Sequence, residues 1–88
     1  RKKAESYLEF MAFSRSGLIT QLEFEGFSTQ DATYGTDSIN ADWNEQAAKK
    51  AASYLDTMAF SRSGLITQLE FEGFTPAQAA YGVSTTGL

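Results

Sequence analysis

The chain contains no cysteine and no histidine, and its 88 residues include a single proline. The lack of cysteine rules out disulfides, thiolate chemistry and cysteine–histidine metal sites. The lack of histidine removes the commonest acid–base catalyst. Apolar runs extend over only a few residues, so no segment is long enough to span a bilayer. We therefore expect no catalytic residue, no metal site and no cofactor, and we do not expect an enzyme.

Positive charge is also scarce. Seven basic residues face 11 acidic ones, which gives a net charge of −4 and a pI near 4.6. Hydrophobic residues make up 42% of the chain, a globular and not a disordered composition. The sequence begins with Arg1 and shows no signal peptide, so we interpret it as a soluble fragment, with any targeting or anchoring segment outside it.

What the chain does have is an internal repeat. The 17 letters MAFSRSGLITQLEFEGF occur at 11–27 and again at 58–74 without a change. The similarity extends over 2–35 and 49–82, which indicates a tandem duplication. A unit of about 38 residues rarely buries enough apolar surface to fold alone. The two copies are therefore expected to pack on each other or on the segment between them.

Start and stop signals divide each copy into three short helices. Ser14 and Ser61 are natural N-caps, and Gly26 and Gly73 suit the left-handed residue that ends a helix. No segment alternates polar and apolar residues, so we predict an all-α protein, a tandem duplication of a helix-turn-helix-like unit, and a monomer. The expected parts are repeat 1 at 1–38 with helices about 1–12, 15–25 and 29–37, a connector at 39–46 that includes the start of the next helix, and repeat 2 at 47–88 with helices about 43–59, 62–72 and 76–83.

A helix-turn-helix unit suggests DNA binding, but its charge argues against it. Phosphate contacts need Lys or Arg, and the third helices, which read STQDATYG and TPAQAAYG, contain neither. The acidic chain as a whole would repel a duplex. Nucleic-acid binding is kept as the alternative function, and a nucleic-acid partner is not expected.

The most unusual feature is an aromatic residue between two glutamates in each copy. Phe71 follows Leu69 by about 200° around the helix, so it cannot share the buried stripe of a lone helix. One interpretation is that Phe24 and Phe71 pack against the neighbouring repeat or the connector. The other is that each forms the apolar centre of an acidic partner-binding surface. The candidate partner-binding residues are Glu23, Phe24, Glu25, Asp31, Glu70, Phe71 and Glu72.

Two further ambiguities remain open. Arg15 and Arg62 begin their helices, where the helix dipole disfavours a cation, so each is either paired with a carboxylate or solvated. Surface positions such as Thr20 and Glu23 are the same in both copies, although packing does not require it. Either the duplication is recent, or the outer face of the second helix is itself in use.

The motifs SYLxxMAFSRSGLITQLEFEGF and DWNEQAAKKAASYL, which together cover nearly the whole chain, resemble the host cell surface-exposed lipoprotein domain. This is the repeat of Ltp-type superinfection-exclusion lipoproteins, which temperate phages of Gram-positive bacteria encode. The resemblance implies a protein held on the outer face of the host membrane by a lipid anchor outside this fragment. It also implies that the protein blocks DNA injection by incoming phage, with a phage tail protein, the tape-measure protein first, as partner. No small-molecule substrate is implied.

Overall fold

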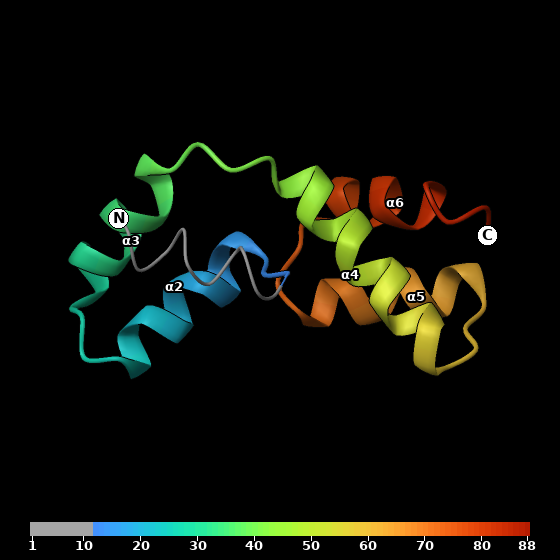
Figure 1. The fold of residues 1–88 in the computed structure, drawn as a ribbon, viewed down its shortest axis with the longest axis horizontal. Helices are drawn as coiled ribbons and strands as arrows, with labels where there is room; N and C mark the ends of the chain where they lie inside the picture. The colour runs from blue at the N-terminus through green and yellow to red at the C-terminus, as the bar shows by residue number, and fades with distance from the viewer. Residues whose placement is uncertain (1–11) are drawn as a thin grey trace.

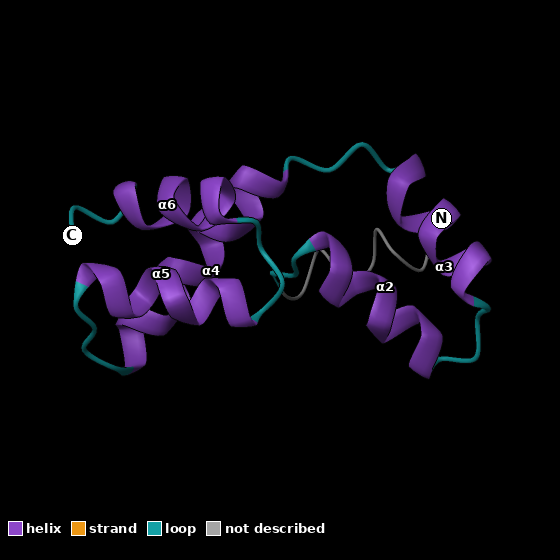
Figure 2. Cartoon of the chain, turned by 180° about the vertical axis from the view of Figure 1, so that it is seen from behind, coloured by secondary structure: helices purple, strands orange, loops and turns teal. Residues whose placement is uncertain are grey.

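The computed structural model describes residues 12–88 and places five helices there, with no strand among them. They are α2 (Arg15–Phe24), α3 (Thr29–Ser38), α4 (Trp43–Thr57), α5 (Arg62–Phe71) and α6 (Pro76–Ser84). The prediction of an all-α tandem duplication is confirmed. The helix expected at about 1–12 lies outside the described residues. Figure 1 shows α2 and α3 forming one half of an elongated molecule and α4, α5 and α6 the other, and Figure 2 shows the same halves from behind.

Identical residues begin α2 and α5. The side chain of Ser14 accepts a hydrogen bond from the backbone N–H of Gly17, and Ser61 accepts one from Gly64 in the same way. Both serines have extended backbone, with φ of −75°. These N-caps satisfy donors that would otherwise lack a partner at the first turn.

The same two helices also end alike. Gly26 has φ +103° and Gly73 has φ +102°. The N–H of Gly26 donates to Glu23 and the N–H of Phe27 donates to Leu22, at 3.0 and 3.2 Å, which is the Schellman pattern. Only glycine adopts this φ without strain, so it reverses the chain between the second and third helix of each unit.

Each half has its own core. Leu65, Leu69 and Val83 are fully buried in the second half, beside alanines from α4 and α6. Leu18, Leu22 and Ala32 form the core of the first half, and Ile39, which follows α3, and Trp43, which begins α4, pack against it. Small residues let the helices of the second half approach closely, because a Cβ at Gly82 would lie 2.7 Å from the backbone carbonyl of Ala47.

The two halves meet end to end. The C-terminus of α5 lies against the N-terminus of α2, and both helices run in the same direction along the long axis (Figure 1). At this junction the Ser14 hydroxyl donates to the Glu72 carbonyl at 2.5 Å, and the Phe13 N–H donates to the Gln46 side chain at 3.4 Å. The negative end of one helix dipole thus faces the positive end of the next, which is favourable.

Among the described residues, the Thr36 hydroxyl is buried without a hydrogen-bond partner. Thr36 is 0% exposed, whereas copy 2 has Val83 at the matching position. We expect Thr36→Val to raise the free energy of unfolding by about 1 kcal/mol, because it removes a desolvated hydroxyl at constant shape. In a chain of this size the melting temperature, measured by circular dichroism, should rise by roughly 4–8 °C.

The reciprocal change provides the control. Val83→Thr should lower the melting temperature, since it buries a hydroxyl in a fully apolar cluster. A lower melting temperature for Thr36→Val would instead mean that the Thr36 hydroxyl is satisfied in solution.

Candidate functional site

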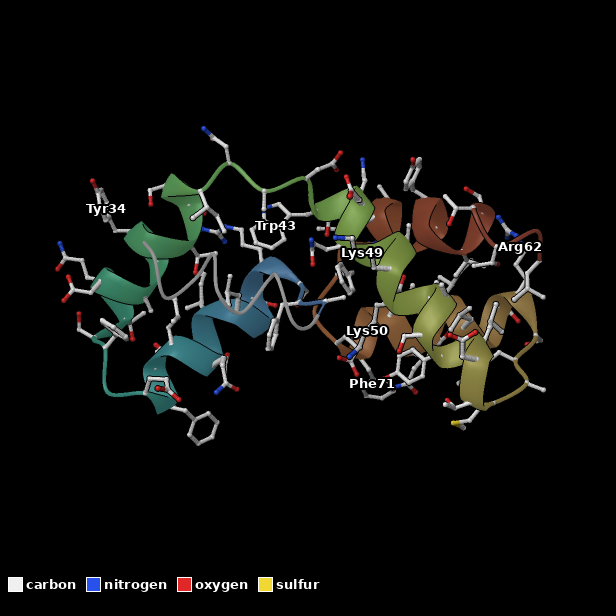
Figure 3. The ribbon with its side chains drawn as sticks, viewed as in Figure 1. Tyr34, Trp43, Lys49, Lys50, Arg62 and Phe71 are labelled. Carbon is white, nitrogen blue, oxygen red and sulfur yellow. The ribbon has the colours of Figure 1, made fainter. Side chains whose placement is uncertain are left out.

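The two phenylalanines of the predicted site are the most exposed large apolar side chains in the described part of the chain. Phe24 is 82% exposed and Phe71 is 83% exposed. The interpretation that they pack against the neighbouring repeat or the connector is therefore wrong. Figure 3 shows Phe71 at the edge of the molecule away from α6. Aromatic residues are enriched at protein–protein interfaces, so two exposed rings at matching positions are candidates for partner contact.

Each phenylalanine borders a shallow hollow lined by the same three residue types. In copy 1 the hollow, which is wide open to solvent, is lined by Thr20, Glu23 and Phe24. In copy 2 an equally open hollow is lined by Thr67, Glu70 and Phe71. We call these two places the acidic hollows. Each offers an apolar ring, a carboxylate and a hydroxyl on one helical face, because positions i, i+3 and i+4 lie together on a helix.

The threonines were not among the candidate residues that the sequence indicated. Thr20 and Thr67 precede their phenylalanines by four residues, so they occupy the next turn of the same face. Their identity between copies was the available signal. Without knowing that Phe24 and Phe71 are exposed, however, that signal fits a recent duplication equally well.

The two hollows differ in how their glutamate is held. In copy 1 the Thr29 hydroxyl donates a short hydrogen bond to Glu23. Copy 2 has Pro76 at the matching position, which has no hydroxyl. Glu70 is exposed and contacts no described cation at ion-pair distance. The carboxylate of the copy 2 hollow is thus the more accessible of the two.

Glu72 faces α4 and not its hollow. The Tyr54 hydroxyl donates to Glu72 at 2.6 Å, and Lys50 lies 3.7 Å from the same carboxyl group. This hydrogen bond, together with burial, raises the pKa of Tyr54 above its usual value. The Gln68 amide donates to the Tyr54 hydroxyl at 3.2 Å and completes a polar cluster between α4 and α5. Glu72 therefore serves the packing of these helices.

The remaining candidates lie outside the hollows. Asp31 is exposed in the first turn of α3, where its negative charge interacts favourably with the helix dipole. Its backbone N–H donates to the Ser28 side chain. Glu25 follows α2 as its C-cap residue and lines neither hollow. The structure thus brings together Glu23 with Phe24 and Glu70 with Phe71, and separates both pairs from Glu25, Glu72 and Asp31.

The two arginines that begin α2 and α5 differ in whether they are paired with a carboxylate. Arg15 makes a two-pronged ion pair with Asp37, at 2.7 and 2.9 Å. The hydrogen bond to Arg15 lowers the pKa of Asp37, and the same bond raises the pKa of Arg15. Copy 2 has Ser84 where copy 1 has Asp37, and Arg62 makes no ion pair with the described residues. The presence of Asp37 in copy 1, and its absence from copy 2, thus determines whether the arginine is paired.

Other kinds of site find no support between residues 12 and 88. No group of three or more acidic, cysteine or histidine side chains there is placed to hold a metal ion. No helix in that part is both long and apolar enough to cross a membrane.

Both copies of the repeat match a known protein family. The family model described as host cell surface-exposed lipoprotein matches residues 1–39 and again 42–85. The chain belongs to this family of surface-exposed lipoproteins, and both copies are family repeats. Its fold is similar to that of Ltp, a superinfection exclusion protein from the Streptococcus thermophilus temperate phage TP-J34, with a TM-score of 0.88 and 33% identity over 94% of this chain and 87% of that one. No curated protein sequence matched the chain.

Proposed function

We propose that this protein prevents superinfection by binding, through its two acidic hollows, a basic or amphipathic polypeptide of the incoming phage. Membership in the surface lipoprotein family and similarity to a superinfection exclusion protein support the general role. The observation that carries the binding mode is that Phe24 and Phe71 stand exposed beside Glu23 and Glu70, in the same arrangement twice.

The chemistry of a hollow defines its ligand. An exposed ring accepts the aliphatic stem of a lysine or arginine, while the neighbouring carboxylate pairs with its charged end. Because acidic residues outnumber basic ones by 11 to 7, the long-range field also attracts a positively charged segment. A neutral or acidic polypeptide would gain neither contribution.

Two sites of the same composition on one chain add avidity. A partner with two suitable segments binds the second hollow as an intramolecular event, at an effective concentration in the millimolar range for short flexible spacers. Weak contacts at each hollow then suffice for a stable complex. This gives the strict repetition of Thr, Glu and Phe a function.

The resemblance points to a tail component as the partner. A protein on the outer face of the host membrane meets the phage proteins that arrive there during DNA injection. The tape-measure protein is the first candidate among them. Binding it would block injection and leave adsorption of the phage unaffected.

Reversing the charge of both hollows tests the proposal. Glu23→Lys with Glu70→Lys should abolish exclusion in a plaque assay, and should prevent capture of the tail protein in a pull-down at low salt. Binding by the unchanged chain should weaken as salt is raised, because the contacts are ionic and exposed. Adsorption of phage should stay the same in every variant.

A second double variant provides the control. Glu45→Lys with Asp56→Lys changes the net charge by the same amount at exposed positions of α4, outside both hollows. It should keep exclusion. If the hollow variant excludes phage as well as the control does, the hollows do not bind the partner.

No observation favours the nucleic-acid alternative. The helices that would enter a groove, α3 and α6, contain no lysine or arginine. A gel shift with duplex DNA at low salt tests this directly, and duplex affinity above background would revive the alternative.

A further inference from the structure

The two acidic hollows have the same side chains but hold their glutamates differently. In copy 1 the Thr29 hydroxyl donates a hydrogen bond to Oε2 of Glu23, and Glu23 is half-buried. In copy 2 Glu70 is exposed, and within residues 12–88 neither a hydrogen bond nor an ion pair engages its carboxylate. One glutamate therefore has an oxygen already in use, whereas the other has both oxygens available for a ligand.

The difference originates in the third helix of each unit. The segment that carries the hollow has the same 17 letters in both copies, so it cannot distinguish them. Thr29 is the first residue of α3, whereas Pro76 is the first residue of α6 and has no hydroxyl. The side chains of Thr75 and Gln78 bond to each other's backbone N–H and serve the start of α6. The residue that begins the third helix thus decides whether the glutamate is held.

Arginine uses both oxygens of a carboxylate in its strongest contact. Its guanidinium presents parallel N–H groups that a carboxylate accepts side by side. The chain itself contains such a pair, in which Arg15 donates to the two carboxylate oxygens of Asp37 at 2.7 and 2.9 Å. An arginine that enters the copy 1 hollow must compete with Thr29 for Oε2 of Glu23. At Glu70 no described group competes with it.

Lysine does not need the second oxygen. Its ammonium group is a compact charge that pairs with a single carboxylate oxygen. Thr29 bonds to Oε2 of Glu23, which leaves Oε1 for an ammonium group. The phenylalanine ring beside each glutamate offers the same apolar contact in both hollows, so it does not separate them. The hydrogen bond from Thr29 therefore acts on arginine and not on lysine.

We propose that the copy 2 hollow selects arginine, whereas Thr29 denies the copy 1 hollow this selectivity, so that lysine binds the two hollows equally. This inference rests on the proposed function, because it assigns the cation that each hollow takes from a basic polypeptide. A partner with one arginine-bearing and one lysine-bearing segment would then bind in a single direction, with its arginine at Glu70.

An NMR titration of the full 88-residue chain with two synthetic peptides tests this proposal. Each peptide has acetylated and amidated ends and one cationic residue between leucines, arginine in the first and lysine in the second, so neither can bridge the hollows. The ring signals of Phe24 and Phe71 report the dissociation constant at each hollow. The arginine peptide should bind the copy 2 hollow about fivefold more tightly, the effect of one exposed hydrogen bond. The lysine peptide should bind both hollows equally.

Exchanging the residue that begins the third helix should exchange the preference. Thr29→Val removes the hydroxyl at nearly constant shape and should raise the affinity of the copy 1 hollow for the arginine peptide about fivefold. Pro76→Thr supplies a hydroxyl in copy 2 and should lower the affinity there by about the same factor. The dissociation constants of the lysine peptide should not change in either variant, which separates this effect from a general change in structure. Circular dichroism should show both variants folded.

The outcomes distinguish this inference from the proposed function. If the arginine peptide binds both hollows of the unchanged chain equally, or if Thr29→Val weakens its binding at Phe24, the inference is wrong while the hollows remain binding sites. If neither peptide shifts the signals of Phe24 and Phe71, the proposed function and this inference are both wrong.

Discussion

Replacing both Phe24 and Phe71 with alanine should eliminate partner binding while leaving the fold unchanged. Exposed aromatic residues at the centre of an interface commonly contribute about 2 kcal/mol each, which is roughly a 30-fold change in affinity. Each single variant should therefore weaken binding about 30-fold, and the double variant about 1,000-fold because the sites act together. Isothermal titration against the captured tail protein measures both values.

The fold should not respond to these changes, since both rings are more than four-fifths exposed. The free energy of unfolding should change by no more than about 0.5 kcal/mol, the range of ordinary surface substitutions. Tyr34 offers a matched control, because it is 75% exposed on α3 and lines neither hollow. If Tyr34→Ala weakens binding as strongly as Phe71→Ala, the contact surface has been misplaced.

Replacing Gly82 with alanine should destabilise the protein severely. The new Cβ would lie 2.7 Å from the carbonyl carbon and oxygen of Ala47 and 2.9 Å from its Cβ. Two of these atoms belong to the backbone of α4, so no side chain can rotate away. The helix must move, which opens the cluster that holds Ala51 and Val83. We expect a cost of about 3 kcal/mol, a large part of the stability of a domain this size.

Helix propensity alone predicts the opposite sign. Alanine is about 1 kcal/mol better than glycine inside a helix, so Gly82→Ala would stabilise an isolated α6. Thermal unfolding followed by circular dichroism decides between the two, with an expected fall of roughly 15 °C. Ser84→Ala, at an exposed position of the same helix, should change little. A higher melting temperature for Gly82→Ala would show that α4 and α6 do not approach as closely as described.

The sequence predicted the local features well because each is encoded within a few residues. Ser14 and Ser61 cap their helices as expected, and Gly26 and Gly73 end theirs at positive φ. Caps and turns depend on neighbours along the chain, which one sequence displays completely. The prediction of all-α structure follows from these signals.

Features that depend on spatial neighbours could not be predicted in the same way. Arg15 and Arg62 have the same neighbours along the chain over 17 residues, yet only Arg15 is paired, because α3 folds back to bring Asp37 beside it. Ser14 and Ser61 differ in burial for the same kind of reason. The exposure of Phe24 and Phe71 required knowing that the other repeat docks at the end of the helix and not along its side.

The repeated segment takes one shape in two surroundings. Its cap has φ −75° in both copies, and its closing glycine has φ +103° in one and +102° in the other. The surroundings differ, because the start of the segment contacts the other repeat only in copy 1, and its end does so only in copy 2. Its own sequence determines its backbone geometry. Recombination can therefore copy or exchange the segment in frame without changes elsewhere in the chain. A gene built from such segments can lengthen or shorten its product in whole repeat units, and each unit keeps its own caps and turns.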